Sequence, residues 1–287
     1  MPNCPICEQA FETGRTSWLL RCPGCGFERS TLAESISDAA SRGVIDERAR
    51  SNALSSLRER NFQTILEAVG SLREGQGALL EVGCAHGWFL RAAERRGWHA
   101  LGIEPDPDIA RLALRNGSRV RSGVFPQALR AGERFDVIAF NDVFEHLQDV
   151  SGALQACAGA LQPGGLLVIN LPDARGAFYR LSCLLARAGY GAPLERLWQK
   201  GFPSPHLSYF TAPLLRRLAA KHGFRPLHGG RLPSVSLRGL WSRLRYDRSA
   251  GMLGSAAAWA GSCVLMPALR LLPPDISLEI FETPRAG

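Results

Sequence analysis

The chain has very little lysine, and one long segment has very few acidic residues. Of the 34 basic residues only Lys200 and Lys221 are lysines. A bias of genomic composition is enough to explain the preference for arginine. It does not explain residues 174–250, where 14 basic residues stand with only two acidic ones. A surface depleted of acidic groups in this way favours an anionic partner. The candidates are a phosphorylated molecule, a membrane surface and RNA.

The N-terminus lacks the basic stretch and apolar run of a secretory signal, so we expect a cytoplasmic protein. No internal repeat of 20–50 residues is found. Hydrophobic residues make up 46% of the 287 residues. This share excludes wholesale disorder and is enough for one medium domain with a small appendage.

Composition and periodicity divide the chain into three parts. Residues 1–30 are rich in cysteine and glycine, residues 31–74 are predicted to form a linker and helices, and residues 75–287 form the main domain. In the main domain short apolar runs alternate with helical patterns, which is typical of βαβ units on a parallel sheet. Strands are predicted at 78–83, 99–104, 118–122, 135–140, 166–171, 224–228 and 276–281. Helices are predicted at 51–72, 87–96, 106–116, 150–161 and 212–222.

Four of the eight cysteines form two Cys-X-X-Cys pairs near the N-terminus. Cys4 and Cys7 make the first pair, and Cys22 and Cys25 make the second, with 14 residues between the two pairs. Four thiolates complete the tetrahedral shell of a zinc ion and leave no open position, so the pattern predicts a structural zinc ribbon. The alternative is a redox pair, which usually follows a strand and opens a helix. The other cysteines are expected to be small buried residues: Cys84, Cys157, Cys183 and Cys263.

The run 79–90 predicts an apolar strand, a glycine-rich turn and the start of a helix. Gly83 and Gly87 allow the backbone to approach a ligand closely, and the N-terminus of a helix favours a carboxylate there. An acidic residue, Glu104, ends the next strand, 23 residues after Glu81. Such an acid can accept hydrogen bonds from both hydroxyls of a ribose.

Several motifs together resemble those of class I S-adenosylmethionine-dependent methyltransferases, and in particular the ubiquinone-type O-methyltransferase group. The run 79–90 resembles the first motif of this class, and residues 102–106 resemble the second. Residues 135–147 resemble the fourth-strand motif of the ubiquinone-type group. Residues 161–171 resemble the signature of helix, turn and fifth strand, and residues 206–211 are similar to a late segment of the same group.

The resemblance implies an α/β fold of the Rossmann-like kind, with a seven-stranded, mostly parallel sheet whose last strand is antiparallel. It also implies S-adenosylmethionine as cofactor. One position differs from the family pattern, because Ala85 stands where the turn usually has its middle glycine, and alanine is small enough to keep the close approach. A dinucleotide-dependent dehydrogenase is a rival for a glycine turn followed by an acid, but the fourth-strand and Pro-Gly-Gly motifs argue against it.

The resemblance further implies which residues bind the cofactor. The acid and the glycine turn after the first strand would hold its methionine end, and the acid after the second strand would hold the ribose. An aromatic residue would line the adenine pocket, and the end of the fourth strand would lie beside the methyl group. In this order the residues are Glu81, Gly83, Cys84, Ala85 and Gly87; Glu104 and Pro105; Phe125; and Asn141 and Asp142.

Methyl transfer is an in-line displacement on a carbon that the sulfonium already activates. The protein aligns the acceptor and, for a hydroxyl, removes its proton. Candidate groups are His146, His206, Glu145 and Tyr209. His146 follows the fourth strand, at the edge where open α/β sheets bind ligands, and histidine titrates near neutrality. The alternatives are that Glu145 and His146 only shape the loop or cap a helix, and that His206 only packs or forms hydrogen bonds.

The preferred function is methylation of an oxygen on a small or lipid- or sugar-linked anionic acceptor. An RNA base methyltransferase is the rival enzyme, because some rRNA methyltransferases resemble this layout and the basic segment suits phosphate. A non-catalytic zinc-ribbon adaptor that retains the fold is the second alternative, and the intact cofactor motifs argue against it. The sequence does not indicate the oligomeric state.

Residues 230–274 are predicted to form a helical insertion before the last strand, and residues 252–269 within it have no charge. Their length permits a transmembrane helix, but alanine, glycine and serine dilute the stretch and Pro267 interrupts it. We expect a buried helix or substrate lid. The alternative is an interfacial helix that makes a peripheral contact with the inner face of an anionic membrane.

Overall fold

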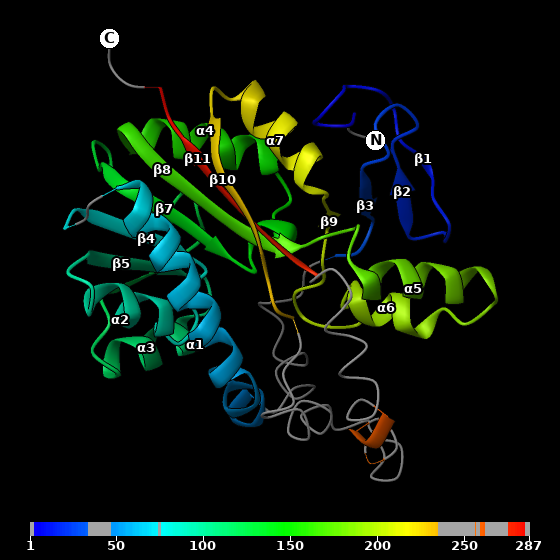
Figure 1. The fold of residues 1–287 in the computed structure, drawn as a ribbon, viewed down its shortest axis with the longest axis horizontal. Helices are drawn as coiled ribbons and strands as arrows, with labels where there is room; N and C mark the ends of the chain where they lie inside the picture. The colour runs from blue at the N-terminus through cyan, green and yellow to red at the C-terminus, as the bar shows by residue number, and fades with distance from the viewer. Residues whose placement is uncertain are drawn as a thin grey trace.

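The computed structural model describes residues 3–33, 47–73, 76–234, 256, 259–261 and 275–284, and of residues 47–56 the backbone alone. A seven-stranded sheet forms the centre of the molecule, with helices on both of its faces (Figure 1). In spatial order the strands are β10 (Arg225–Leu232), β11 (Ile276–Glu282), β8 (Leu161–Pro172), β7 (Phe135–Asn141), β4 (Ala78–Val82), β5 (His99–Glu104) and β6 (Val120–Ser122).

Strand direction in this sheet follows the expected pattern. Parallel pairing joins β6, β5, β4, β7 and β8. The last strand, β11, pairs antiparallel with β8 on one side and with β10 on the other. The predicted Rossmann-like α/β fold, mostly parallel with an antiparallel last strand, is therefore confirmed.

Neighbouring residues of each central strand point to opposite faces and enter different hydrophobic cores. Leu79 belongs to a core with α1 and α2, whereas Leu80 belongs to a core with α4 and α7. Both leucines are fully buried, and each such side chain contributes roughly 1.5–3 kcal/mol relative to an exposed position. The helices are α1 (Glu47–Leu72), α2 (Trp88–Glu94), α3 (Pro107–Arg115), α4 (Val150–Ala160) and α7 (Ala212–Lys221).

The cysteine-rich N-terminal unit, residues 3–30, is joined to the rest of the molecule through a second sheet. Its strands β1 (Glu12–Thr13), β2 (Leu19–Arg21) and β3 (Glu28–Ser30) are followed in that sheet by β9 (Ser208–Tyr209). Strand β3 pairs antiparallel with β9. The ring of Phe27 lies 4.8 Å from that of Phe210, and Phe27 belongs to the same core as α4 and α7. The unit thus buries its apolar residues against the main domain.

Two short helices lie beside the N-terminal unit on the right of Figure 1: α5 (Ala177–Arg187) and α6 (Ala192–Leu197). Tyr179 of α5 and Trp198 after α6 share a small core with Leu19 of β2. The rings of Trp18 and Trp198 meet edge to face, 5.9 Å apart. These helices therefore pack against the N-terminal unit and not against the central sheet alone.

Three predicted strands differ from the structure by more than one residue at an end, and one of them, predicted at 166–171, runs from Leu161 to Pro172. The strand predicted at 118–122 begins only at Val120, because Ser118 is used elsewhere: its N–H bonds to the carbonyl of Ala113 at the end of α3, and its hydroxyl lies 3.4 Å from the carbonyl of Gly87. The strand predicted at 224–228 continues to Leu232, because β11 pairs with it along its length.

The predicted insertion, residues 230–274, lies mostly outside the described residues. Its first residues complete β10, and residues 256 and 259–261 are helical. The rest of the uncharged stretch 252–269 is outside the described part of the chain. Among the helices that the structure describes, none has both the length and the apolar character needed to cross a bilayer.

Candidate functional site

A chain of buried polar groups crosses the carboxyl edge of the central strands. Asn141, at the end of β7, donates to Oε1 of Glu81 on β4 at 2.8 Å, and its Oδ1 accepts from Asn170 of β8 at 2.8 Å. Oδ1 of Asn170 accepts from the backbone N–H of Asp142 at 3.0 Å. The three side chains are buried. The network fixes the ends of three neighbouring strands at the edge where open parallel sheets bind ligands.

The turn after β4 approaches its neighbours too closely for larger residues. Gly83 has a φ of 68°, and a Cβ on it would lie 2.6 Å from Cγ2 of Val143. Gly87, with a φ of 70°, stands directly before α2. Ala85 is also left-handed, with a φ of 44°, which costs a non-glycine residue roughly 1–2 kcal/mol. This strain explains why the family pattern has glycine at this position. Ala85 nevertheless adopts the left-handed conformation that a glycine would have in the turn.

Glu104, at the end of β5, lies beside this turn. Its Oε2 accepts the N–H of Ala85 at 2.9 Å, and its Oε1 accepts the N–H of Asp106 at 3.0 Å. Only 6% of the residue is exposed. Each carboxylate oxygen has a second lone pair, so a ligand hydroxyl can still donate to it. The hydrogen bonds hold the carboxylate at the same strand edge as Glu81.

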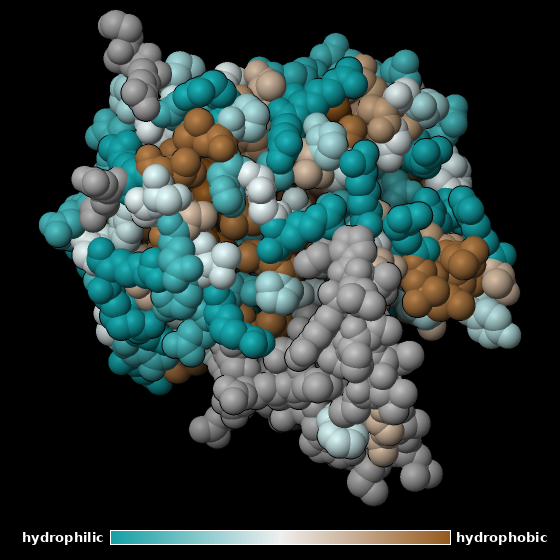
Figure 2. All heavy atoms as spheres, viewed as in Figure 1, coloured by the Kyte–Doolittle hydropathy of each residue, from teal (hydrophilic) through white to brown (hydrophobic). Residues whose placement is uncertain are grey.

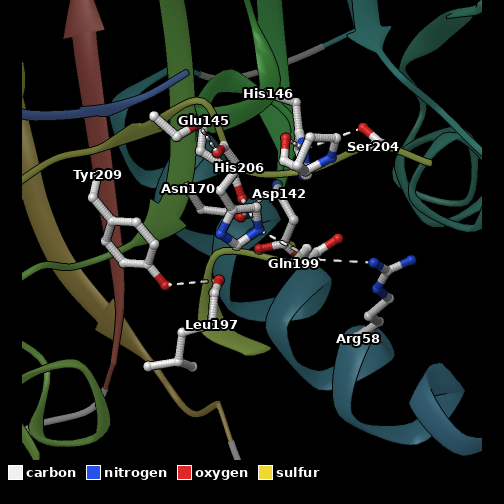
Figure 3. Close-up of polar contacts among 12 residues, drawn as sticks. Arg58, Asp142, Glu145, His146, Asn170, Leu197, Gln199, Ser204, His206 and Tyr209 are labelled. Atoms are coloured by element: carbon white, nitrogen blue, oxygen red, sulfur yellow. Dashed lines mark hydrogen bonds and ion pairs between the residues drawn. The ribbon is translucent and has the colours of Figure 1, made fainter. Parts of the chain in front are cut away.

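A cavity lies between the turn and helix α1. Its lining includes residues predicted from the turn and strand ends and others that were not predicted: Glu81, Gly83, Cys84, Ala85 and Asn141, with Arg58, Phe62, His86, Trp88 and Phe89. Arg58 and Phe62 stand one helical turn apart on α1. Nη2 of Arg58 lies 3.9 Å from Oδ2 of Asp142 (Figure 3). Helix α1 therefore forms one wall of the cavity.

Two histidines and a glutamate meet next to Asp142 (Figure 3). Glu145 and His146 come from a short turn after β7, η2 (Phe144–His146), and His206 comes from the segment before β9. The rings of His146 and His206 meet edge to face, 4.7 Å apart. Ligand atoms of the three residues lie within 4.8 Å of one another, so the cluster could also hold a cation. The fold thus brings together three groups that are up to 61 positions apart in the chain (206 minus 145).

His146 is held in one tautomer. Its Nδ1 lies 2.9 Å from the carbonyl oxygen of Pro205 and 3.1 Å from Oγ of Ser204. A carbonyl oxygen can only accept, so Nδ1 carries the proton and donates it to Pro205. The proton-accepting nitrogen is then Nε2, as a general base requires.

Burial shifts the pKa of each of the other three candidate groups in the direction that favours its uncharged form. Burial, followed by the charge of Asp142, raises the pKa of Glu145 well above its usual range. Burial, followed by His146, lowers the pKa of His206 well below its usual range. Burial, followed by Glu145, raises the pKa of Tyr209 well above 10, and its hydroxyl donates to the carbonyl of Leu197 at 3.3 Å.

Nε2 of His206 is already engaged, because the side-chain amide nitrogen of Gln199 lies 2.8 Å from it. An amide N–H donates, so this nitrogen of His206 accepts. Only His146 thus combines a fixed tautomer with partial exposure. Of the predicted candidates, His146 has the environment that best suits a base.

The four N-terminal cysteines form one cluster. Sγ of Cys4 lies 3.6 Å from that of Cys25, and Sγ of Cys7 lies 3.2 Å from that of Cys22. All four sulfurs lie within 4.8 Å of one another, and none forms a disulfide. A zinc–sulfur distance of about 2.3 Å in a tetrahedron places the sulfurs roughly 3.8 Å apart, so the cluster fits a closed tetrathiolate site.

A model of the methyltransferase domain matches residues 48–228, which is more than half of the chain. This chain belongs to that family of methyltransferase domains. The matched range includes α1, the glycine turn, both strand-end acids, the histidine cluster and β9. The predicted family is therefore confirmed.

Curated relatives of this methyltransferase domain include ubiquinone biosynthesis O-methyltransferases. The one from Bradyrhizobium diazoefficiens is 28% identical over 117 residues, which are 39% of this chain and 44% of the relative. The one from Xanthomonas axonopodis pv. citri is 30% identical over 157 residues, which are 52% of this chain and 62% of the relative. The chain thus spans about half the length of the curated relatives it matches.

Solved structures agree with the fold. Phosphoethanolamine N-methyltransferase 2 of Haemonchus contortus, solved in complex with S-adenosyl-L-methionine, has a TM-score of 0.51 and 17% sequence identity. The similarity covers 79% of this chain and 53% of that one. At this identity the likeness shows the shared architecture of S-adenosylmethionine-dependent methyltransferases.

The polar groups that line the cavity of this methyltransferase domain suit a cationic group such as the cofactor of the family carries. Oε2 of Glu81 is buried and has no hydrogen-bond partner among the described residues. Burial, opposed by the hydrogen bond of Asn141 and by Arg58, raises the pKa of Glu81 to about 8. A cationic ligand group at this place would satisfy that oxygen and favour the ionised carboxylate.

Five of the ten predicted cofactor residues line the described cavity, and five do not: Gly87, Glu104, Pro105, Phe125 and Asp142. Phe125 is buried edge to face against Phe140 in the core, 5.6 Å between ring centroids, and it is not among the lining residues of the described cavity. Pro105 follows Glu104 and is half-buried. Asn170 and Gln199 were missed. The signal for Asn170 was present, since it is the polar residue inside an apolar strand.

Proposed function

We propose that this methyltransferase domain transfers the methyl group of S-adenosylmethionine to an oxygen of a small or lipid- or sugar-linked anionic acceptor. The observation that carries the proposal is the hydrogen bond from Nδ1 of His146 to the carbonyl of Pro205. It supports a base at the carboxyl edge of the sheet, next to the cofactor turn. A hydroxyl acceptor needs such a base, because its proton must leave during transfer.

On the cofactor side, the bound sulfonium would supply an activated methyl group. Glu81 would bind the ammonium group of the cofactor, and Arg58 on α1 would bind its carboxylate. Glu104 would accept from the ribose hydroxyls. The backbone of the turn at Gly83, which lines the cavity, would lie against the ligand.

On the acceptor side, the bound cofactor would supply the methyl group to the acceptor oxygen, and its sulfur would keep the electron pair of the broken carbon–sulfur bond. Nε2 of His146 would take the hydroxyl proton of the acceptor, while its Nδ1–H keeps the hydrogen bond to Pro205. Holding the base and the acceptor in one geometry supplies most of what an already activated methyl donor needs.

We further propose that Cys4, Cys7, Cys22 and Cys25 hold one structural zinc ion. The support is the closed cluster of four thiols without disulfides. A zinc ion there would fix the N-terminal unit and with it strand β3. Since β3 pairs with β9, the metal would also support His206, which lies two residues before β9.

The test uses S-adenosylmethionine with a deuterated methyl group, incubated with the purified protein and a cell extract. Mass spectrometry then follows the label in the aqueous phase, in the lipid phase and in nucleosides from digested RNA. A labelled methyl ether in the aqueous or lipid phase is the expected result. A label on a base of RNA would replace this function with the rival one.

The His146→Asn variant is the control, because asparagine keeps a donor near Nδ1 and has no counterpart of Nε2. The ether label should disappear in this variant. Absence of label with the unaltered chain, although S-adenosylhomocysteine binds, would instead favour the non-catalytic adaptor.

A further inference from the structure

A second and larger hollow lies away from the cofactor cavity, between the N-terminal unit and α5. Its volume is about 790 Å³, which is within the range of small-molecule sites. The N-terminal unit contributes Arg15, Arg21 and Glu28 to its lining, and the other wall includes Tyr179 and the exposed side of α5. We refer to this hollow as the arginine groove.

Five arginines line the arginine groove: Arg15, Arg21, Arg175, Arg180 and Arg187. The one carboxylate in the lining, Glu28, is buried and already bound, since it accepts from Arg15 at 2.6 Å and from the hydroxyl of Tyr179. Within the described part of the chain, the other four guanidinium groups have no carboxylate within 4.0 Å. Glu28 offsets one positive charge and leaves four.

Elsewhere in the molecule many arginines are paired. Arg73 pairs with Asp136, Arg121 with Glu133, and Arg216 with Glu279. Four like charges around one hollow repel one another, and an anion placed between them removes that cost. A guanidinium group presents two parallel N–H donors, a geometry that matches the oxygens of phosphate.

The wall of α5 is apolar as well as basic. Leu181 and Leu184, one helical turn apart, are 52% and 62% exposed, and both line the groove. Arg180 and Arg187 stand on the same exposed side. Figure 2 shows this mixture as a hydrophobic patch over α5 with hydrophilic residues around it. A ligand that filled the groove would therefore join a phosphate group to an apolar part.

We propose that the arginine groove binds the phosphate or diphosphate group of an amphiphilic ligand. The groove is separated from the histidine cluster by two stacked rings, since Tyr179 lies 4.3 Å from Tyr209, whose ring is 5.6 Å from His206. It is thus a site in addition to the cofactor cavity. The proposal does not depend on the proposed methyl transfer, because its test measures binding alone.

The test titrates the full chain with inorganic pyrophosphate in a calorimeter, at fixed ionic strength, and compares two double variants. Arg180→Gln with Arg187→Gln removes two charges from the groove. The control, Arg95→Gln with Arg115→Gln, removes two exposed charges, one directly after α2 and one at the end of α3. We expect the groove variant to bind pyrophosphate about 10-fold more weakly or worse, and the control variant to bind as the unaltered chain does. Affinity for S-adenosylhomocysteine checks that both variants are folded.

A second arm identifies the source of the phosphate. Vesicles of phosphatidylglycerol and of phosphatidylcholine are sedimented with each protein, with and without pyrophosphate. Pyrophosphate binding without vesicle binding supports a soluble ligand, and groove-dependent vesicle binding that pyrophosphate displaces supports a lipid headgroup. No pyrophosphate binding, an equal loss in both variants, or vesicle binding that is unchanged in the groove variant would overturn the proposal.

Discussion

The proposed cofactor side of the site and its proposed acceptor side are assembled from chain segments that lie at very different separations in the sequence. On the cofactor side, Glu81, Gly83, Glu104 and Asn141 follow one another along three neighbouring strands. On the acceptor side, the N-terminal unit pairs through β3 with β9, which begins 178 positions after the end of β3.

Hydrogen bonds show how the acceptor side depends on these distant contacts. The hydroxyl of Ser30 donates to the carbonyl of His206 at 2.8 Å, and the N–H of Ser30 donates to that of Leu207 at 2.9 Å. The N–H of Leu207 in turn donates to the carbonyl of Glu145 at 2.8 Å. The N-terminal unit is thus part of the frame that holds the histidine cluster, whereas the cofactor side has its frame in the central sheet. A substitution that disrupts one side should therefore leave the binding or chemistry of the other side intact.

The largest difference between the effects on methyl transfer and on cofactor affinity is expected for a substitution of the proposed base. His146→Asn should lower methyl transfer by about 10²–10⁴-fold, since that is the range for loss of a general base, while affinity for S-adenosylhomocysteine stays within about threefold. His206→Asn should affect transfer less, because its Nε2 is already engaged by Gln199. Label incorporation and titration calorimetry measure the two quantities. Equal losses in the two variants would remove the assignment of His146 as the base.

The metal site should act mainly on the acceptor side. We expect one zinc per chain by metal analysis and its release in Cys22→Ser, with the protection of residues 207–209 against hydrogen exchange falling by about 100-fold because β3 loosens. Affinity for S-adenosylhomocysteine should change little, and the isosteric Cys157→Ser, away from the cluster, should keep the metal. If zinc is lost while residues 207–209 stay protected, the N-terminal unit does not support β9.

The cofactor side should respond to its own acid. Glu104→Ala removes the proposed acceptor of the ribose hydroxyls and also leaves the N–H groups of Ala85 and Asp106 without a partner. A loss of roughly 1–3 kcal/mol, or about 10-fold or more in the affinity for S-adenosylhomocysteine, is expected. Hydrogen exchange at residues 207–209 should stay as it is. Unchanged affinity would mean that the ribose is bound elsewhere.

The smallest expected effect is the pH dependence of cofactor affinity through Glu81. With a raised pKa of about 8, Glu81 keeps its proton at pH 7, and binding the ammonium group of S-adenosylhomocysteine requires its release. Affinity should therefore rise about fivefold from pH 7 to pH 8, with nearly one proton released at pH 7. Calorimetry in two buffers of different ionisation enthalpy counts the protons. Glu81→Gln, which cannot titrate, should show neither effect.

The raised pKa of Glu81 also makes the free energy of unfolding depend on pH. Between pH 4.5 and about 8 the folded protein without cofactor holds a proton on Glu81 that the unfolded chain releases. The contribution of this group to the free energy of unfolding therefore falls as the pH rises through that window. Cofactor binding reverses the penalty, because it pairs the carboxylate with a positive charge.

Sequence patterns were sufficient for the parts of the molecule whose position follows from the strands. Glu81 and Glu104 each end an apolar strand, and the carboxyl ends of neighbouring parallel strands share one edge, so their proximity was predictable. The two Cys-X-X-Cys pairs were likewise predictable as one cluster. The sequence-based prediction of these features needed only local spacing.

Other features depend on docking, which local spacing does not encode. Arg58 and Phe62 face the cavity only because α1 crosses the glycine turn, and nothing in the helical period selects that face. Gln199 reaches His206 from an irregular segment. The pairing of β3 with β9 involves two residues on each strand, too few to give a recognisable alternation. These contacts come from tertiary packing, so only the structure shows them.

Strand β11 imposes an order on assembly during synthesis. It lies between β8 and β10, so β10 leaves the ribosome before the strand that connects it to the sheet exists. Until β11 arrives, β8 and β10 each expose an unpaired edge, and buried partners of Leu278 and Ile280 remain open to water. A nascent chain halted before residue 276 is therefore the form most exposed to aggregation and to chaperones.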